Sequence, residues 1–289
     1  MQKGKNAEIQ GVIRDFTLFD DFFFPRYLDG NIECTEFILR TILDIQDLKV
    51  ISTDTQKFIA NIENRSVQLD VLATDSKGKL YDIEIQKNEA GANSKRARFY
   101  SSMLDYDNSA KGMDPKDLPE TYVIFITRSD VLRKGKPVYR VERCIMGSGE
   151  EFGDGSHIVY VNGENTDSTP LGHLMHDFKC KRADDMHYDV LRKRMRFFKE
   201  TKEGEQEMSE TMETLMAKVE AEGRKEGRKE GRKQGRMEGR MENKREIATK
   251  MLKNGNYSIE DIAEIVTLSV DEITALKADL QKQTELSEE

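Results

Sequence analysis

The sequence lacks any long hydrophobic run. No stretch approaches the roughly 18 to 20 apolar residues that a membrane-spanning helix needs, and charged residues make up 35% of the 289 residues. The chain also does not open with the cationic, apolar and small-residue pattern that is typical of a signal peptide. We therefore expect a cytoplasmic protein without a membrane partner.

Cysteine is scarce as well. Cys34, Cys144 and Cys180 are odd in number and far apart, which suits a reducing compartment better than a disulfide framework. Because no Cys-x-x-Cys pair is present, the cysteines do not indicate a zinc site.

Charge is unevenly distributed along the chain. The net charge is −8, but residues 222–245 hold ten Lys and Arg against five Glu, which leaves −13 on the remainder. An acidic body with a basic segment can still bind DNA if its cations line one surface. Composition therefore neither supports nor excludes a nucleic-acid partner.

Residues 67–86 carry the clearest pattern in the chain. Apolar and polar residues alternate in 67–73 and again in 80–86, which is the period of strands. Between them, Asp75-Ser-Lys-Gly78 is typical of a turn, since glycine adopts positive φ at little steric cost. We predict a β-hairpin whose first strand carries four apolar residues on one face: Val67, Leu69, Val71 and Ala73.

The register of this hairpin decides its chemistry. Burying both apolar faces together sets Asp70 opposite Glu84 and Gln68 opposite Gln86, with 75–79 as the turn. Opposed residues have Cβ atoms only about 5 Å apart, and like charges there are destabilising. A divalent cation such as Mg²⁺, bound through one or two carboxylates with waters completing its shell, would resolve the repulsion.

Other segments predict an α/β core with a mixed sheet. The expected elements are an aromatic and partly irregular segment at 16–25, helices at 33–44, 94–108 and 171–178, and strands at 57–63, 121–127, 138–144 and 157–161. The helix at 94–108 lets the apolar strand at 121–127 lie parallel to a neighbour. The last two strands are expected to extend an edge of the same sheet.

Two sets of side chains leave alternatives open. Glu36 lies one residue off the apolar stripe of the first helix, so it is either a solvated residue or a carboxylate aimed at the site. His173 and His176 lie three residues apart with His187 nearby. A zinc site would need another ligand, and we interpret these histidines as surface or packing residues.

A four-residue repeat, Glu-Gly-Arg-Lys, begins at Glu222, Glu226 and Glu230 and recurs in relaxed form at Gln234 and Glu238. On a helix its glycines would form a slowly winding stripe, and the five together cost about 5 kcal/mol relative to alanine. We predict a flexible stalk over 201–245, or a helix that forms where chains pack at the glycine stripe. A solvated linker is favoured over oligomerisation or phosphate contact.

The tail, residues 246–289, is expected to form a small helical module. Ser258 with Asp261, and Ser269 with Glu272, have the spacing of helix N-caps followed by an acidic residue. The resulting short helices resemble a helix-turn-helix in spacing. Because the second helix is acidic, we favour an interaction module over a DNA reader.

The hairpin has the spacing of a metal-dependent nuclease site: Asp70, thirteen residues, Glu84, one residue, Gln86. Two adjacent strands present two carboxylates to one cation, which lowers the pKa of a bound water and neutralises a phosphate. Gln86 lies on the same face as Glu84 and would position the nucleophile or steady developing charge.

Four stretches resemble the PD-(D/E)xK nuclease superfamily, and within it the recombination-promoting nuclease (Rpn) family of transposase-like proteins. They are Leu69-Asp70-Val71, Tyr81-Asp-Ile-Glu84-Ile-Gln86, Lys95-Arg-Ala-Arg-Phe-Tyr-Ser-Ser-Met103 and Tyr122-Val-Ile-Phe-Ile126. The likeness spans almost the whole chain, because the Glu-Gly-Arg repeats and the helical tail also look like this family. It implies a restriction-endonuclease-like αβββαβ core.

The resemblance also implies roles for the acidic residues. Asp70 and Glu84 would ligate Mg²⁺ or Mn²⁺, Gln86 would occupy the place of the superfamily's lysine, and Glu36 would match an acidic residue of the first core helix. Leu69 replaces the proline of the motif and should matter little. Gln86 is the larger departure, because it removes a cation near the scissile phosphate, although the Rpn pattern also looks like Glu-x-Gln.

Arg96 and Arg98 would face the DNA phosphates by the same resemblance. They do not share a helix face, so one of them could instead pair with an acidic residue.

The sequence thus predicts a metal-dependent DNA endonuclease of the recombination or transposition type. Residues 1–200 form the nuclease-like domain, 201–245 the stalk and 246–289 the helical module, with DNA as partner and a homo-oligomer formed through the stalk or the terminal helices. The alternative is a nuclease-fold protein without catalysis that binds nucleic acid or oligomerises.

Overall fold

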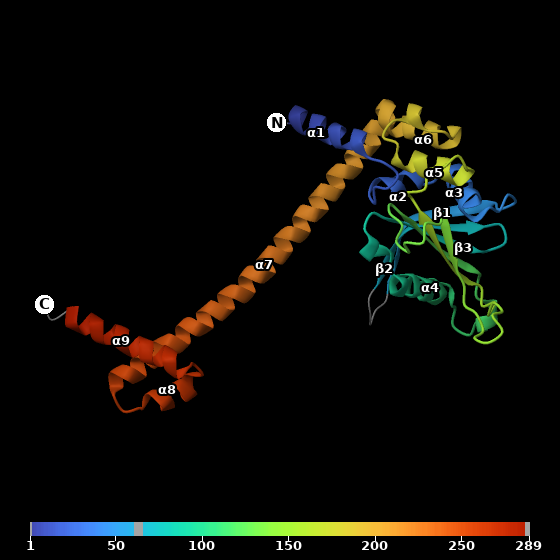
Figure 1. Ribbon diagram of the computed structural model, residues 1–289. Coiled ribbons are helices and arrows are strands. Elements are labelled where there is room, and N and C mark those ends of the chain that lie inside the picture. The colour runs from blue at the N-terminus through green and yellow to red at the C-terminus, as the bar shows by residue number, and fades with distance from the viewer. Residues whose placement is uncertain (1, 61–65, 287–289) are drawn as a thin grey trace. The chain divides into compact units, whose positions relative to one another are not determined.

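The computed structural model describes residues 2–60 and 66–286. The chain divides into two compact units, Met1–Met212 and Glu213–Glu289. The division falls within helix α7 (Lys202–Asn254), a single continuous helix of 53 residues (Figure 1).

The first unit is built on a six-stranded sheet in the order β1-β2-β3-β4-β6-β5. Its strands are β1 (Val50–Ile59), β2 (Val67–Asp75), β3 (Leu80–Gln86), β4 (Thr121–Thr127), β5 (Val138–Val141) and β6 (Ser156–Asn162). The pairs β3–β4 and β4–β6 are parallel and the other three are antiparallel. The predicted mixed sheet and its edge extension by the last two strands are confirmed.

Helices cover both faces of this sheet (Figure 1). They are α1 (Gln2–Asp15), α2 (Phe23–Leu28), α3 (Ile32–Leu43), α4 (Ser94–Asn108), α5 (Pro170–Lys179) and α6 (Asp189–Glu200). One buried cluster joins the sheet to α2, α3, α5 and α6, and a second joins its opposite face to α4. In β4, Ile124 and Ile126 belong to the first cluster and Val123 and Phe125 to the second. The almost wholly apolar pattern of this strand therefore reflects burial on both faces.

The hairpin has the predicted register. The pairs between β2 and β3 run from Val71–Ile83 to Thr74–Leu80. Gly78 in the turn has a φ of +79°, as expected for the turn chemistry.

The prediction that Val67, Leu69, Val71 and Ala73 share one face is wrong. Val67 and Leu69 pack in the cluster beneath α4, whereas Val71 and Ala73 pack in the other cluster. The change occurs at Asp70, opposite a kink in β1 where Gln56 has a φ of +56°. The kink lies between the pairs Thr55–Val71 and Lys57–Leu69, and it turns the strand so that both segments stay buried.

Strand β1 begins seven residues earlier than predicted. The segment 50–56 is rich in Ser, Thr and Asp, but β1 is an edge strand of the sheet, where one face and one row of backbone groups meet solvent. Polar residues are therefore compatible with the strand. The end of the predicted strand, residues 61–63, lies outside the described residues.

The second unit contains a small helical module. Helices α8 (Ile259–Val266) and α9 (Val270–Leu286) follow α7, and a cluster that includes Ala248, Ile262 and Ile273 joins the three. Both predicted N-caps are present, since Ser258 and Asp261 form a reciprocal capping box and Ser269 and Glu272 bond in the same way.

The glycine stripe of α7 gives a first testable prediction. At each of its five positions an added Cβ would meet no heavy atom within 4 Å of the described chain: Gly223, Gly227, Gly231, Gly235 and Gly239. Replacing all five with alanine is expected to stabilise the helix by about 4 to 5 kcal/mol, because glycine costs about 0.8–1 kcal/mol per residue in a helix. Thermal unfolding followed by far-UV circular dichroism measures the change.

Gly204 in the same helix is the matched control. A Cβ there would overlap with the backbone of Phe197 and Phe198, so Gly204→Ala is expected to lower the unfolding midpoint. A lower midpoint for the five-alanine variant would contradict the prediction and would indicate that the stripe contacts another chain.

Candidate metal and phosphate site

The hairpin opens where the two predicted ligands face each other. Backbone pairing between β2 and β3 ends at Val71–Ile83. Beyond this pair, hydrogen bonds to side chains take the place of hydrogen bonds between the two backbones. The backbone N–H of Asp70 donates to Glu84 Oε1 at 2.9 Å, and the backbone N–H of Ile85 donates to Asp70 Oδ2 at 3.0 Å. Each carboxylate is held by the opposite strand, so the structure brings Asp70 and Glu84 together.

A third carboxylate, Asp82, lies on the same face of β3 as Glu84. Both are buried on the α4 side of the sheet, with 0% and 1% of their surface exposed, so this face is not solvated. Within the described residues, neither oxygen of Asp82 accepts a hydrogen bond from a donor group. Its carboxyl group lies against that of Glu84, and the two can share a hydrogen bond only while one is protonated. Buried oxygens without a donor are a feature that a cation would satisfy.

Burial governs the protonation of this cluster. It raises the pKa of Glu84 well above its ordinary value, and the charges of Asp82 and Asp70 add to the effect. Burial also raises the pKa of Asp82, again with a contribution from Asp70. For the partly buried Asp70, burial raises the pKa to about 6, and the Asp21 carboxylate contributes. A divalent cation would displace the protons that the cluster retains.

Arg96 supplies positive charge to the cluster from the first turn of α4. Its Nη2 lies 3.5 Å from Glu84 Oε2 and donates to the Tyr100 hydroxyl at 2.6 Å. The Asn93 side chain accepts the backbone N–H of Arg96 at 3.0 Å and caps the helix at this point. One guanidinium against three carboxylates leaves a net negative charge when all are ionised, which is the charge that a divalent cation requires.

Gln86 ends β3 beside a short 3₁₀ turn, Glu89–Ala92. A Cβ added at Gly91 would overlap with the Gln86 side-chain amide and would lie 3.7 Å from Arg96 Nη1. The missing side chain at Gly91 therefore leaves the space in which the Gln86 amide lies, next to the guanidinium.

A cavity of about 590 Å³ opens beside these groups. It is lined by Ser66, Val67, Gln68, Ala90, Asn93, Lys95, Arg96, Phe99 and Tyr100. Cations that contact phosphates and aromatic rings that stack on bases are what nucleic-acid strands bind. This wall of the site is therefore suited to nucleic acid.

Glu36 is not brought to the site. Its Oε2 accepts the backbone N–H of Val50 at 2.9 Å and its Oε1 pairs with Arg40 at 2.8 Å. Val50 pairs with Asp75 at the hairpin turn, five residues along β2 from Asp70, or about 16 Å. Glu36 thus fixes the start of β1.

Arg98 also lies apart from the cavity. It is exposed and sits about 200° around the helix from Arg96, whereas Lys95 lines the cavity. Sequence reasoning assigned no role to Lys95, Asp82 or Asp21. Asp82 could have been found from strand alternation, since it is two residues before Glu84, whereas nothing in the local sequence points to Asp21.

Comparison with known families decides the identity of the fold. A family model described as PD-(D/E)XK nuclease family transposase matches residues 32–253. The chain belongs to this family. Comparison with curated proteins returned no match, and neither did comparison with solved structures. Nucleases of the PD-(D/E)XK superfamily generally use divalent metal ions and act on DNA, which agrees with the chemistry of the acidic cluster and the cavity.

Among the described residues, no helix of this PD-(D/E)XK family member is both long enough and apolar enough to span a membrane.

Proposed function

We propose that this protein is a metal-dependent DNA endonuclease of the recombination-promoting type, in which Asp70 and Glu84 hold Mg²⁺ or Mn²⁺. The observation that carries the proposal is the opened hairpin. There two carboxylates face each other across the strands, next to the unpaired oxygens of Asp82. Hard carboxylate oxygens in this number are what Mg²⁺ takes from a protein, with waters completing its shell.

Different side chains of the protein have different roles in the proposed phosphodiester hydrolysis. A bound divalent cation supplies an acidified water and neutralises phosphate charge. Asp70 and Glu84 fix its position through their hydrogen bonds to the opposite strands. The Gln86 amide orients the attacking water by hydrogen bonding, and Arg96 holds the scissile phosphate from the other side. Lys95 contacts the phosphates along the cavity, and Arg98 contacts the more distant ones.

The remaining segments are proposed to act outside the chemistry. Residues 1–200 carry the nuclease, 201–245 form the stalk, and 246–289 form an interaction module. The exposed glycine stripe and the terminal helices are the surfaces through which copies of the chain would associate.

The glutamine at position 86 is an observation that favours one alternative function. In this alternative the protein has a nuclease fold but binds nucleic acid without cleaving it. A lysine at this position would bring a positive charge to the scissile phosphate, and an amide does not. Lys87 does not replace it, because its Nζ pairs with Asp20 at 2.7 Å and Asp21 at 3.6 Å. Calorimetric titration with Mg²⁺ or Mn²⁺, with and without DNA, separates the two functions. A site that takes up no metal favours the binding protein.

Nicking of supercoiled plasmid DNA by the purified full-length chain tests the proposal. Conversion to open-circular and linear DNA should require Mg²⁺ or Mn²⁺ and should cease with a chelator. Salt-dependent DNA binding without any nicking would support the non-catalytic function instead.

The Gly91→Ala variant tests the role of Gln86. The added methyl must displace the Gln86 amide, so nicking is expected to fall by about 10²-fold, the typical loss when one positioned hydrogen-bonding group is removed. Initial rates of plasmid nicking, measured at saturating Mg²⁺, report the change.

Gly11→Ala is the control, because an added Cβ there meets nothing within 4 Å in the described chain. If Gly91→Ala nicks DNA as fast as Gly11→Ala, the amide has no part in the reaction.

A further inference from the structure

Three of the four histidines in the chain gather on the other side of the sheet from the acidic cluster. His173 and His176 lie on α5, and His187 lies just before α6. The rings of His173 and His187 stack with centroids 4.2 Å apart, and those of His176 and His187 meet edge to face at 4.6 Å. Helices α5 and α6 pack in the cluster opposite α4, so this group is separate from Asp70 and Glu84.

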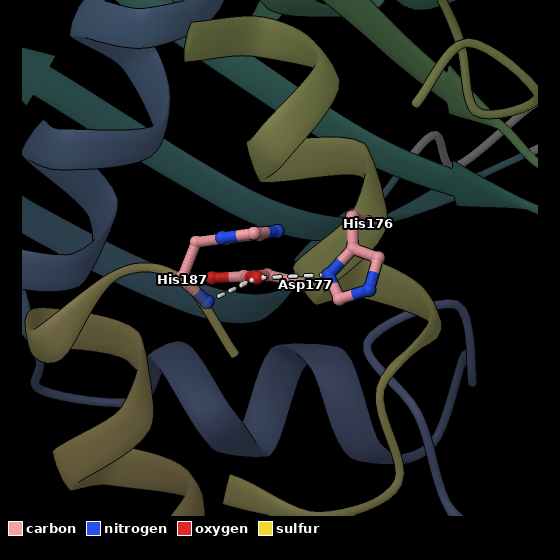
Figure 2. Close-up of side chains that lie close together, drawn as sticks. All are labelled: His176, Asp177 and His187. Carbon is pink, nitrogen blue, oxygen red and sulfur yellow. Dashed lines mark hydrogen bonds and ion pairs between the residues drawn. The ribbon is translucent and has the colours of Figure 1, made fainter. Parts of the chain in front are cut away.

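Asp177 lies at the centre of this group and is fully buried. Its Oδ1 accepts the backbone N–H of His187 at 2.7 Å, and its Oδ2 accepts that of Tyr188 at 2.9 Å. Each carboxylate oxygen has two lone pairs, so both oxygens retain capacity for a ligand bond. Backbone donors that orient a carboxylate in this way are typical partners of a metal-ligating group. Figure 2 shows the His187 ring beside the Asp177 carboxylate and the His176 ring at its other end.

The separations fit a tetrahedral transition metal. One ligand atom each from His176, Asp177 and His187 lie within 4.8 Å of one another, and His176 Nδ1 is 3.4 Å from Asp177 Oδ1. A zinc ion with bonds of about 2.0–2.1 Å to nitrogen and oxygen places neighbouring ligands about 3.4 Å apart. A small closure of the His187 side chain, which is exposed, would complete the set.

We propose that His176, Asp177 and His187 bind a Zn²⁺ ion that fastens the end of α5 to the start of α6. Two imidazoles and a carboxylate suit zinc better than the hard cations Mg²⁺ and Ca²⁺, which prefer oxygen alone. The fourth position belongs to water. The ion neutralises a buried carboxylate and closes the loop between two helices that pack on the core.

Cys180 lies close to this site but is not one of the ligands. Its Sγ is 3.6 Å from His176 Nδ1 and lies within bonding distance of the backbone carbonyls of His176 and Asp185. The thiol is therefore engaged with the two carbonyls.

Zinc titration of the metal-stripped, full-length protein tests the proposal. An excess of Mg²⁺ is present throughout to compete with zinc for the carboxylates of the hairpin. We expect one Zn²⁺ per chain by calorimetry and a rise in the unfolding midpoint. His187→Ala keeps its backbone bond to Asp177 and should fold, yet its zinc affinity should fall by more than the 10- to 100-fold that loss of an outer-shell partner costs. His176→Ala should behave alike.

His157→Gln is the matched control, since His157 lies on β6 and pairs with Glu142 at 2.8 Å. It should bind zinc as the parent does. Co²⁺ in place of Zn²⁺ should give the intense visible absorption of a tetrahedral ion, and His187→Ala should lose it. Equal zinc affinity in the parent and His187→Ala, or a weak octahedral Co²⁺ spectrum in the parent, would overturn the proposal.

Discussion

Glu84→Gln and Asp70→Asn are each expected to abolish Mg²⁺-dependent nicking of plasmid DNA. Each change removes one negative charge from the pair that would hold the cation, while the remaining side-chain oxygen can still accept the N–H of the opposite strand. Loss of several kcal/mol of metal-derived stabilisation corresponds to about 10³-fold or more in rate. The measurement is the initial rate of nicking by purified variants.

Glu36→Gln is the matched control for Glu84→Gln. It makes the same chemical change, but its side chain bonds to Val50 and Arg40 at the far end of β1. Its nicking should remain within about a factor of three of the parent rate, as expected for a change remote from the site. Parent-like rates in Glu84→Gln would remove the basis for a metal site in the hairpin.

The metal-free protein is expected to lose stability relative to Asp70→Asn as the pH rises from 4 to 6. Burial raises the pKa of Asp70 from 3.8 to about 6, so within this window the folded state holds a proton that the unfolded state has released. Stability from this group is complete below the unfolded pKa and is lost as the pH passes the folded pKa. The loss is on the order of 3 kcal/mol, since a tenfold change in proton affinity equals about 1.4 kcal/mol.

Urea unfolding at several pH values, in the presence of a chelator, measures this difference between parent and variant. Mg²⁺ should reverse the loss above pH 6, because the cation binds the ionised carboxylates. The Asp70→Asn protein should lack the part of the loss that comes from Asp70, and Mg²⁺ should rescue it less than the parent, although Asp82 and Glu84 still titrate in it. A difference in free energy of unfolding that is constant from pH 4 to pH 7 would contradict the raised pKa.

The hairpin was predictable from the sequence because its two strands constrain each other. Alternation indicated the faces of β3, and the requirement to bury both apolar faces together, with 75–79 as the turn, predicted the register that brings Asp70 and Glu84 together. The helix at Ser94–Asn108 matched its prediction to the residue, because Asn93 caps it and the apolar positions follow a helical period.

The face change at Asp70 was not predictable, because it depends on a kink at Gln56 in a neighbouring strand. The burial of Asp82 and Glu84 also could not be predicted from the sequence pattern, because acidic residues on one face of a hairpin are usually solvated. Here α4, the next α-helix along the chain, covers that face, and this tertiary packing decides the environment of both side chains. The placement of Glu36 at the start of β1 likewise depends on a tertiary contact, its bond to the Val50 N–H.

Helix α1 (Gln2–Asp15) was missed for a different reason. The helix is mostly polar, and the aromatic residues that follow it led to the prediction of a partly irregular segment at 16–25. Ile9 and Ile13 nevertheless lie four residues apart and are both buried in the core, the spacing of a helix with a narrow apolar stripe. Two residues are too few to establish a period in the sequence alone.

The hydrogen bonds that the Glu84 and Asp70 carboxylates accept across the strands make the amide protons of Asp70 and Ile85 reporters of the site's state. Both N–H groups are bonded to carboxylate oxygens in place of a neighbouring strand. The rate of hydrogen exchange at these two amides therefore reports how well the two carboxylates are ordered. The exchange rates of amides within the paired segment Val71–Thr74 report the stability of the sheet as a whole. The oxygens that join the two strands are the ones proposed to hold the cation, so filling the proposed site and tightening the hairpin would be one event.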